Sequence, residues 1–197
     1  MGREFRPFDI GRRFRVLPEK SPISSIDRLD LIMAAGAFGS GEHETTASCL
    51  ELLETLPAVS GANLLDLGSG TGILSIAALK LGAGQAVCVD IDPAAIATCR
   101  KNCELNRVSD RVSHIQGTLT DVPQNGFDMI LANIYGDILL EVAEQLVAKA
   151  RPGASLVLSG ILWEYNFDVR QRYERLGCEV LKNRMLEEFS SVLLQKR

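Results

Sequence analysis

Short apolar runs alternate along most of the chain with longer segments in which apolar residues recur at helical spacing. The runs predict strands at residues 64–67, 86–89, 112–116, 127–132 and 155–159. The segments between them predict helices at 73–81, 93–105, 137–150 and 164–176, and a turn is expected at 151–153. Two extended segments near the C-terminus, 179–185 and 190–194, predict an antiparallel strand pair. Strands that alternate with helices of about ten or more residues indicate an α/β fold with a mostly parallel sheet of seven strands and helices on both faces.

The first 35 residues follow a different pattern. Proline residues divide them, and extended segments are expected at 13–17 and 29–33. We therefore expect a β-structured lead-in or linker over residues 1–35 and the main α/β domain over residues 36–197. A glycine-rich loop at 36–46 begins that domain and leads into a helix.

Composition narrows the class of protein. The chain has 197 residues, 46% of them hydrophobic and 23% charged, which is enough to bury a core. Its net charge of -4 gives no electrostatic footprint for direct nucleic-acid binding. No apolar run is long enough for a membrane span, so we expect a cytoplasmic protein without a membrane partner. The five cysteines form no CxxC pair and are expected to be buried thiols, not metal ligands.

Candidate chemistry begins where the strand at 64–67 ends. Gly68, Gly70 and Gly72 follow Asp66 at alternating positions and lead directly into a predicted helix. Glycines at such a turn allow positive φ and let the backbone approach a ligand. Asp90 ends the next strand, at the spacing that places a carboxylate on the hydroxyl groups of a nucleoside ribose. The pattern predicts a site for a nucleotide-like ligand.

The details favour S-adenosylmethionine over a dinucleotide. In the GxGxxG fingerprint the third glycine comes one residue later than Gly72 does. Asp66 stands two residues before the first glycine, where a carboxylate disfavours a pyrophosphate and suits a ligand that carries an ammonium and a sulfonium. Asp92 is expected to cap the helix that starts at Pro93.

Five further residues are candidates for the site. Asn133 ends a strand and has an amide oxygen that can orient an amine. Tyr135 is either a pocket wall or a packing residue, and His43 is either a proton acceptor or an organiser of the glycine-rich loop. Thr46 is expected to cap its helix and to contact the carboxylate of the cofactor, and Phe38 to pack over the cofactor or in the core.

Three motifs together resemble a known family. They are GAFGSGEHETT at 36–46, DLGSGTGILSIAALKLGA at 66–83 and LANI at 131–134. They look like the bacterial lysine methyltransferases that modify ribosomal protein L11, which have the Rossmann-like fold of class I S-adenosylmethionine-dependent methyltransferases. The resemblance implies cofactor contacts at Thr46, Gly68, Asp90 and Asn133. Members of the family carry an N-terminal substrate-recognition domain, and this chain begins at what resembles the linker to it.

The leading hypothesis is transfer of a methyl group from S-adenosylmethionine to an amine nitrogen, either of lysine side chains or of the N-terminus of a ribosomal protein. Two alternatives stay open: a methyltransferase that acts on small molecules, and a cofactor-binding module without activity. Methylation of a nucleic-acid base is disfavoured, since Asn133 lacks the following Pro-Pro-aromatic run and the chain is acidic.

Overall fold

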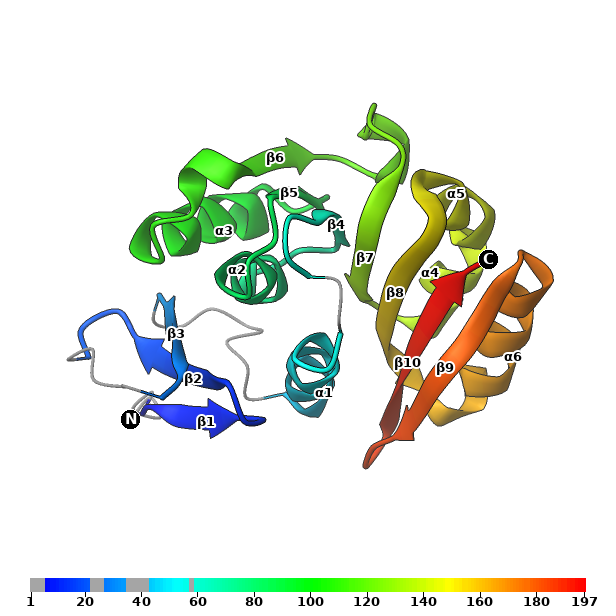
Figure 1. Cartoon of the computed structure of the whole chain (residues 1–197), viewed down its shortest axis with the longest axis horizontal. Helices are drawn as coiled ribbons and strands as arrows, with labels where there is room; N and C mark the ends of the chain where they lie inside the picture. The colour runs from blue at the N-terminus through cyan, green and yellow to red at the C-terminus, as the bar shows by residue number, and fades with distance from the viewer. Residues whose placement is uncertain (1–5, 22–26, 35–42, 57–58) are drawn as a thin grey trace.

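The computed structural model describes residues 6–21, 27–34, 43–56 and 59–197 (Figure 1). Its strands are β1 (Phe8–Ile10), β2 (Phe14–Pro18), β3 (Leu29–Met33), β4 (Asn63–Leu67), β5 (Gln85–Asp90), β6 (Val112–Gln116), β7 (Phe127–Asn133), β8 (Ala150–Leu162), β9 (Cys178–Met185) and β10 (Phe189–Lys196). Its α-helices are α1 (Glu44–Leu53), α2 (Ile73–Lys80), α3 (Pro93–Leu105), α4 (Gly136–Glu141), α5 (Ala143–Lys149) and α6 (Trp163–Arg175). None of the helices that the structure describes is long and apolar enough to cross a membrane.

The larger sheet has seven strands in the order β6-β5-β4-β7-β8-β10-β9. Five neighbouring strands, β6 to β8, are parallel, and β10 runs antiparallel to both β8 and β9. This confirms the expected mostly parallel sheet with its antiparallel C-terminal pair. The strand order reverses between β4 and β7, so their carboxyl ends border the crevice in which ligands of such sheets bind.

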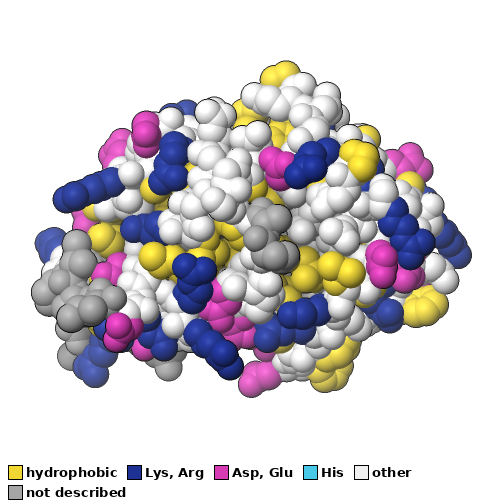
Figure 2. All heavy atoms as spheres, in the orientation of Figure 1, with side chains coloured by type: hydrophobic (Ala, Val, Ile, Leu, Met, Phe, Trp, Pro, Cys, Tyr) yellow, Lys and Arg dark blue, Asp and Glu magenta, His cyan; other side chains and the backbone are white. Residues whose placement is uncertain are grey.

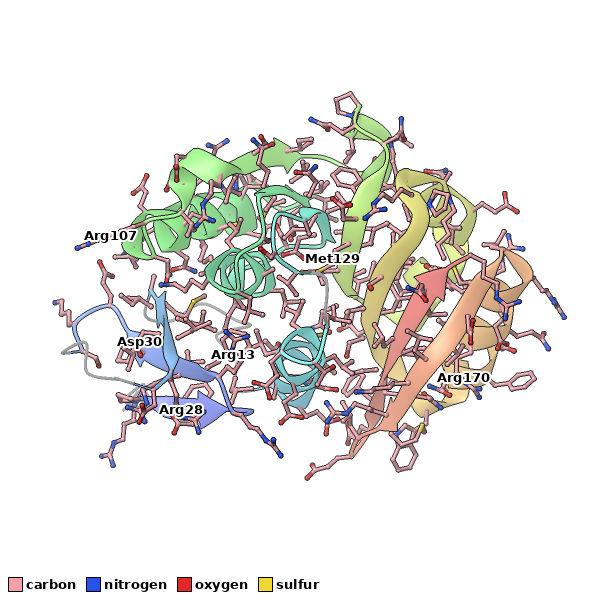
Figure 3. All side chains as sticks on the ribbon, in the orientation of Figure 1. Arg13, Arg28, Asp30, Arg107, Met129 and Arg170 are labelled. Atoms are coloured by element: carbon pink, nitrogen blue, oxygen red, sulfur yellow. The ribbon has the colours of Figure 1, made fainter. Side chains whose placement is uncertain are left out.

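Two hydrophobic cores lie on opposite faces of this sheet. Adjacent residues of a strand point to opposite faces, and accordingly Leu64 packs in the core beneath α1, α2 and α3 while Leu65 packs in the core beneath α4, α5 and α6. Met129 of β7 is buried in the first of these cores (Figure 3). Because both faces are covered, the central strand β7 is buried and apolar from Met129 to Ala132, as the sequence pattern indicated.

The N-terminal strands form a separate three-stranded sheet in the order β1-β2-β3, beside α1 and α2 in Figure 1. Strands β2 and β3 match the expected extended segments, whereas β1 was not expected. The buried side chains of this sheet join the first core of the larger sheet: Ile10, Phe14, Val16, Leu31 and Met33. The division of the chain at residue 35 stays a prediction.

Two expectations about the second half were wrong in detail. The single helix expected at 137–150 is divided into α4 and α5 at Val142, where ψ is 0°. Hydrophobic periodicity does not detect this break, since the buried Leu139 and Leu146 flank it at a spacing of two helical turns, as they would on one face of a continuous helix. The expected turn at 151–153 lies inside β8 as a bulge: β8 advances from Ala150 to Ser155 while β7 advances only from Phe127 to Met129.

The face of the molecule shown in Figure 2 carries Lys and Arg side chains interspersed with Asp and Glu. Such mixing gives no single-sign stripe for a polyanion on this face.

Candidate functional site

The glycine turn follows β4 directly. Gly68, Gly70 and Gly72 have φ values of 69°, 51° and 77°, in the left-handed region that favours glycine. A Cβ on Gly68 would overlap the side chain of Ile134, whereas one on Gly70 would meet no atom of the described residues within 4 Å. The turn therefore needs glycine for its backbone and, at Gly68, for close packing against the residue that follows β7.

Most backbone N–H groups of this turn are engaged inside the protein. Those of Gly68 and Ser69 donate to the carbonyl oxygen of Val89 at 2.8 and 3.0 Å, and that of Gly70 donates to Asp90 Oδ2 at 2.9 Å. Gly72 N–H donates to Ser69 at 2.8 Å. These bonds fix the turn against the end of β5, and they take up donors that a pyrophosphate-binding turn would present to its ligand.

Asp90 lies at the end of β5 and is half-buried. Its Oδ2 accepts from Gly70 and its Oδ1 accepts from the backbone of Asp92 at 3.0 Å. Each oxygen of a carboxylate has a further lone pair, so Asp90 is held in place and can still accept from a ligand. Asp92 caps α3 by accepting from Ala94 N–H at 2.8 Å, which confirms the cap expected there.

Asp66 is buried beneath the turn, with 1% of its surface exposed. Ser75 Oγ of α2 donates to its Oδ2 at 2.7 Å. Burial raises the pKa of Asp66 to about 6, while the Ser75 hydrogen bond opposes that rise. Carboxyl groups whose pKa is shifted by burial are common at functional sites, so Asp66 is a candidate for contact with a ligand.

Asn133 lies at the end of β7, across the crevice from Asp66. Its Nδ2 donates to Thr46 Oγ1 at 3.3 Å, which leaves the amide oxygen on the other side of the group. The backbone beside it is fixed, because Ile134 N–H donates to the Ser159 carbonyl at 3.0 Å. Thr46 is buried in the first turn of α1, so this helix sets the orientation of the Asn133 amide.

The start of α1 is tied to the turn between β9 and β10. His43 caps α1: its Nδ1 accepts from Thr45 N–H at 3.4 Å, and its ring contacts Phe189 edge-on at 5.3 Å between centroids. Glu44 accepts from the N–H groups of Glu187, Glu188 and Phe189 at 2.8 to 3.3 Å. These hydrogen bonds lower the pKa of Glu44 against the opposing effect of its burial, which is the larger single contribution.

Two cavities meet at the carboxyl ends of the strands and share Gly68, Ile134 and Ile138 in their walls. The α1-side cavity, about 310 Å³, is lined among others by His43, Thr46, Asp66, Gly70, Asn133 and Tyr135. The β6-side cavity, about 510 Å³, is lined among others by Asp90, Ile91, Gly117, Thr118, Leu119 and Glu141. The described residues that line the two cavities include three acids and neither lysine nor arginine. This charge suits a cationic ligand and disfavours a polyphosphate.

The structure thus brings together most of the predicted site residues but not all of them. Gly72 lines neither cavity and instead packs against Cys99. Tyr135 is 64% exposed at the rim of the α1-side cavity. Phe38 lies outside the described residues, as does the glycine-rich loop before Glu42.

Several lining residues were not expected from the sequence. Ile91 is 72% exposed beside Asp90, although it is a large apolar residue. Gly117, Thr118 and Leu119 follow β6, and Phe189 begins β10. The same rule that selected Asp90 and Asn133 was available for residues 117–119, because they too follow the carboxyl end of a parallel strand. Phe189 arrives from a distant hairpin, and no local signal marks it.

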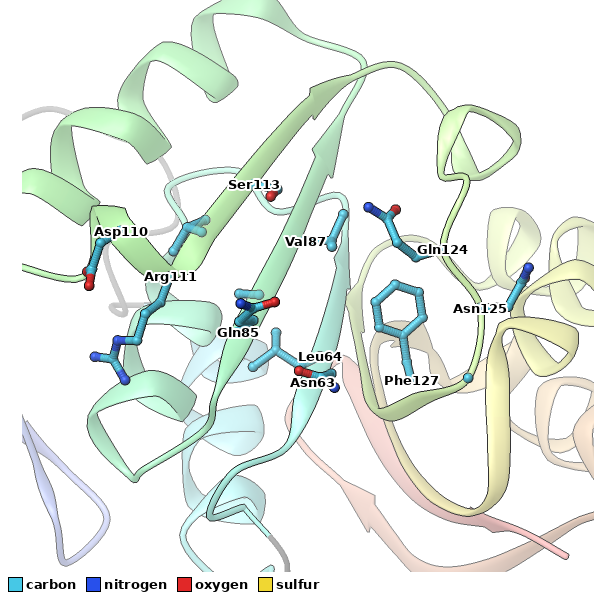
Figure 4. A pocket seen from close by; sticks show the side chains of 13 residues that line it. Asn63, Leu64, Gln85, Val87, Asp110, Arg111, Ser113, Gln124, Asn125 and Phe127 are labelled. Carbon is cyan, nitrogen blue, oxygen red and sulfur yellow. The ribbon is translucent and has the colours of Figure 1, made fainter.

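A third cavity, about 270 Å³, lies at the opposite, amino ends of β4, β5 and β6 (Figure 4). Its lining includes Asn63, Gln85, Arg111 and Phe127. Because ligands of parallel sheets bind at the carboxyl ends, this cavity is not part of the candidate site.

Comparison with known proteins places the chain in a family. The sequence profile of the family described as ribosomal protein L11 methyltransferase (PrmA) matches residues 2–197. A ribosomal protein L11 methyltransferase of Pelobacter propionicus is 43% identical over 188 residues, which are 91% of this chain and 59% of that protein. One of Pseudomonas aeruginosa is 41% identical over 170 residues, 86% of this chain and 57% of that protein. The chain therefore spans somewhat less than two thirds of the length of these relatives.

Solved structures show the same fold. A ribosomal protein L11 methylase of Lactobacillus delbrueckii subsp. bulgaricus superposes with a TM-score of 0.87 at 24% identity, over 98% of this chain and 99% of that chain. A TehB-like SAM-dependent methyltransferase of Corynebacterium glutamicum superposes with a TM-score of 0.60 at 17% identity, over 76% of this chain and 88% of that chain. Together with the match over residues 2–197, these findings show that the chain belongs to the ribosomal protein L11 methyltransferase family.

Proposed function

We propose that this chain binds S-adenosylmethionine and transfers its methyl group to an amine nitrogen of a protein, namely ribosomal protein L11 or a similar ribosomal protein. The observation that carries the proposal is the pair of acid-lined cavities without lysine or arginine among their described lining residues, with Asn133 at the edge of one of them. The names of the relatives supply the substrate, and the charge of the site supplies the kind of cofactor.

The two cavities fit different parts of this cofactor. In the β6-side cavity the free lone pairs of Asp90 suit two ribose hydroxyls, and the exposed Ile91 offers an apolar surface to a base. In the α1-side cavity Asp66 suits the ammonium group, while the start of α1 at Thr46 suits the carboxylate. S-adenosylmethionine, when bound, supplies an electrophilic methyl group on a sulfonium.

The chain itself has to align the acceptor amine and keep it neutral. A lysine has a pKa near 10.4, so its neutral form at pH 7 costs about 4 to 5 kcal/mol, which burial in an apolar pocket can offset. The amide oxygen of Asn133 can accept a hydrogen bond from the amine and direct its lone pair toward the methyl group. We infer that Asn133 orients the acceptor, with Tyr135 at the rim of its entrance.

His43 has two possible roles in this proposal. The structure shows it as the cap of α1, with Nδ1 turned to Thr45. Because Nδ1 accepts there, the neutral ring carries its proton on Nε2, so His43 can act as a proton acceptor only when Nδ1 is released from Thr45. The proposal also includes the acceptor group, which is either a lysine side chain or the N-terminal amine of the substrate protein.

The test is transfer of radiolabelled methyl groups to purified ribosomal protein L11, with calorimetric binding of S-adenosylhomocysteine measured in parallel. We expect label on L11, a loss of about 100-fold in kcat/KM for Asn133→Ala, and little change in S-adenosylhomocysteine affinity. Asn125→Ala, at the opposite end of the sheet, is the matched control and should behave as wild type.

The other outcomes separate the alternatives. Binding of S-adenosylhomocysteine with no label on L11 would contradict transfer to this substrate, and label on small amines alone would indicate a small-molecule methyltransferase. If S-adenosylhomocysteine does not bind, the assignment of the cofactor itself fails.

A further inference from the structure

Three cysteines and a histidine gather on one face of the larger sheet, next to the candidate site but outside its cavities. Cys88 of β5 and His114 of β6 are paired across adjacent parallel strands, so their side chains point to the same face. Cys99 of α3 packs over them, and one atom from each of these three side chains lies within 4.8 Å of the others. Cys103 lies one helical turn after Cys99 and is buried in the same core, but it is not one of these three grouped residues.

This donor set is the one that thiophilic metals prefer. Zn²⁺ binds cysteine sulfur at about 2.3 Å and histidine nitrogen at about 2.0 to 2.1 Å, commonly with four ligands in a tetrahedron. Ligand atoms of such a site lie about 3.8 Å apart, which follows from these bond lengths. The three groups are thus already near this arrangement, and they leave the fourth position of the tetrahedron to another ligand such as water.

The histidine has an unused coordinating atom. Nδ1 of His114 is buried and has no hydrogen-bond partner among the described residues. Buried ring nitrogens are normally paired, and one that is not calls for an explanation. A buried ring nitrogen without a partner, on a side chain grouped with two cysteines, suits a metal ligand.

The cluster also contacts the residues that shape the cofactor site. The Sγ atom of Cys99 lies against Gly72, where an added Cβ would overlap it. Cys88 Sγ donates to Ser75 Oγ at 3.2 Å, and Ser75 Oγ donates to Asp66 at 2.7 Å. A change at the cluster would therefore reach both the glycine turn and the buried acid of the site.

We propose that Cys88, Cys99 and His114 form a three-residue binding site for one thiophilic divalent metal ion such as Zn²⁺. The spacing of the cysteines in the sequence gave no sign of it, because the ligands come from two strands and a helix and contain no CxxC pair. Binding would replace the thiol protons, including the one that Cys88 donates to Ser75.

The test measures Zn²⁺ binding to the full, tag-free chain by equilibrium dialysis, with Cd²⁺ as a spectroscopic probe. We expect one Zn²⁺ per chain and an ultraviolet thiolate-to-Cd²⁺ charge-transfer absorption that saturates at one equivalent. Cys99→Ser and His114→Ala, on different elements, should each weaken binding by at least about 100-fold. Cys178→Ser removes a buried cysteine of β9 outside the cluster and should bind as wild type.

Folding of the variants is checked by the effect of the metal on the midpoint of thermal unfolding. An ion that binds only the folded chain raises this midpoint by mass action, so Zn²⁺ should raise it in wild type and Cys178→Ser alone. No saturable Zn²⁺ binding to wild type would overturn the proposal. Equal Zn²⁺ binding by wild type and by the cluster variants would also overturn it. If a variant does not fold, the Cd²⁺ titration of wild type tests the proposal: absence of the thiolate-to-Cd²⁺ absorption would overturn it.

Discussion

At the scale of single residues, Asp66 couples the stability of the protein to pH. Its pKa is about 6 in the folded chain because of burial, against an ordinary value of 3.8. The folded state therefore holds this proton more tightly than the unfolded state, and the stabilising effect is lost as pH rises from about 4 to about 6. A difference of about two pKa units corresponds to about 3 kcal/mol.

The variant Asp66→Asn should not lose stability in this way, because its side-chain amide does not titrate. The free energy of unfolding of the variant, minus that of wild type, should rise by about 2 kcal/mol between pH 4 and pH 7, as measured by urea unfolding. Ser75→Ala is the companion variant: without its hydrogen bond the pKa of Asp66 rises further, and the loss in that variant extends above pH 6. A difference between Asp66→Asn and wild type that is flat across this range would contradict the assignment.

Thr46 provides a second test at this scale. We expect Thr46→Val to lower kcat for methyl transfer about tenfold, because Asn133 Nδ2 loses its acceptor and the amide loses its fixed orientation. Thr46→Ser keeps the hydroxyl and should retain most of the activity. Equal loss in both variants would show that the shape of the side chain matters and its hydroxyl does not.

Residues at strand ends were the most predictable part of the site. Asp66, Asp90 and Asn133 were selected from the sequence, and the structure places them around two adjoining cavities. Gly72 was selected with the other glycines, but its φ and its contact with Cys99 serve the packing of the turn. A motif predicts where a backbone bends, but it does not distinguish the residues that face a ligand from those that face the core.

At the scale of elements, the close approach of β7 and β8 positions Asn133. Gly160 of β8 has a φ of 79°, and a Cβ there would lie 2.7 Å from the backbone oxygen of Ile134. Gly153 of the same strand has a φ of 81°, and a Cβ there would meet nothing within 4 Å. The two glycines thus have nearly the same φ, but Gly160 is buried and crowded whereas Gly153 is exposed.

This pair isolates the effect of the close approach. Gly160→Ala should lower the free energy of unfolding by about 1 to 3 kcal/mol more than Gly153→Ala does, since the first adds an overlap to the shared cost of positive φ. It should also weaken S-adenosylhomocysteine binding, because Ile134 lines both cavities. If Gly160→Ala and Gly153→Ala have equal effects on the free energy of unfolding and on S-adenosylhomocysteine affinity, β8 moves enough to accommodate the added methyl group.

The order of the elements was predictable because each signal is local. Apolar runs, helical periodicity and turn residues all arise within about fifteen residues of the chain. The break between α4 and α5 and the bulge in β8 depend on how each segment meets its neighbours. The two asparagines that attach the N-terminal sheet, Asn102 of α3 and Asn106 at its C-cap, were not found either, since they bond backbone more than 60 residues away.

At the scale of the whole molecule, these two asparagines join the two sheets. Strand β3 is an edge strand, and Asn106 pairs with it as another strand would: it accepts from Ile32 N–H at 3.0 Å and donates to the Ile32 carbonyl at 2.6 Å. Asn102 accepts from Ala34 N–H at 2.9 Å and donates to the Thr71 carbonyl in the glycine turn at 2.9 Å. Asn102 therefore connects the N-terminal sheet directly to the turn that borders the cofactor site.

The two asparagines should thus separate stability from binding. Asn102→Ala removes the acceptor of the buried Ala34 N–H and one hydrogen bond of the Thr71 carbonyl, and should lower the free energy of unfolding by about 2 to 4 kcal/mol. Asn106→Ala should cost about 1 to 3 kcal/mol, because it frees the half-buried Ile32. Only Asn102→Ala should weaken S-adenosylhomocysteine binding in calorimetry, since only Asn102 holds the glycine turn. If both variants bind equally well, the N-terminal sheet stabilises the fold without setting the geometry of the site.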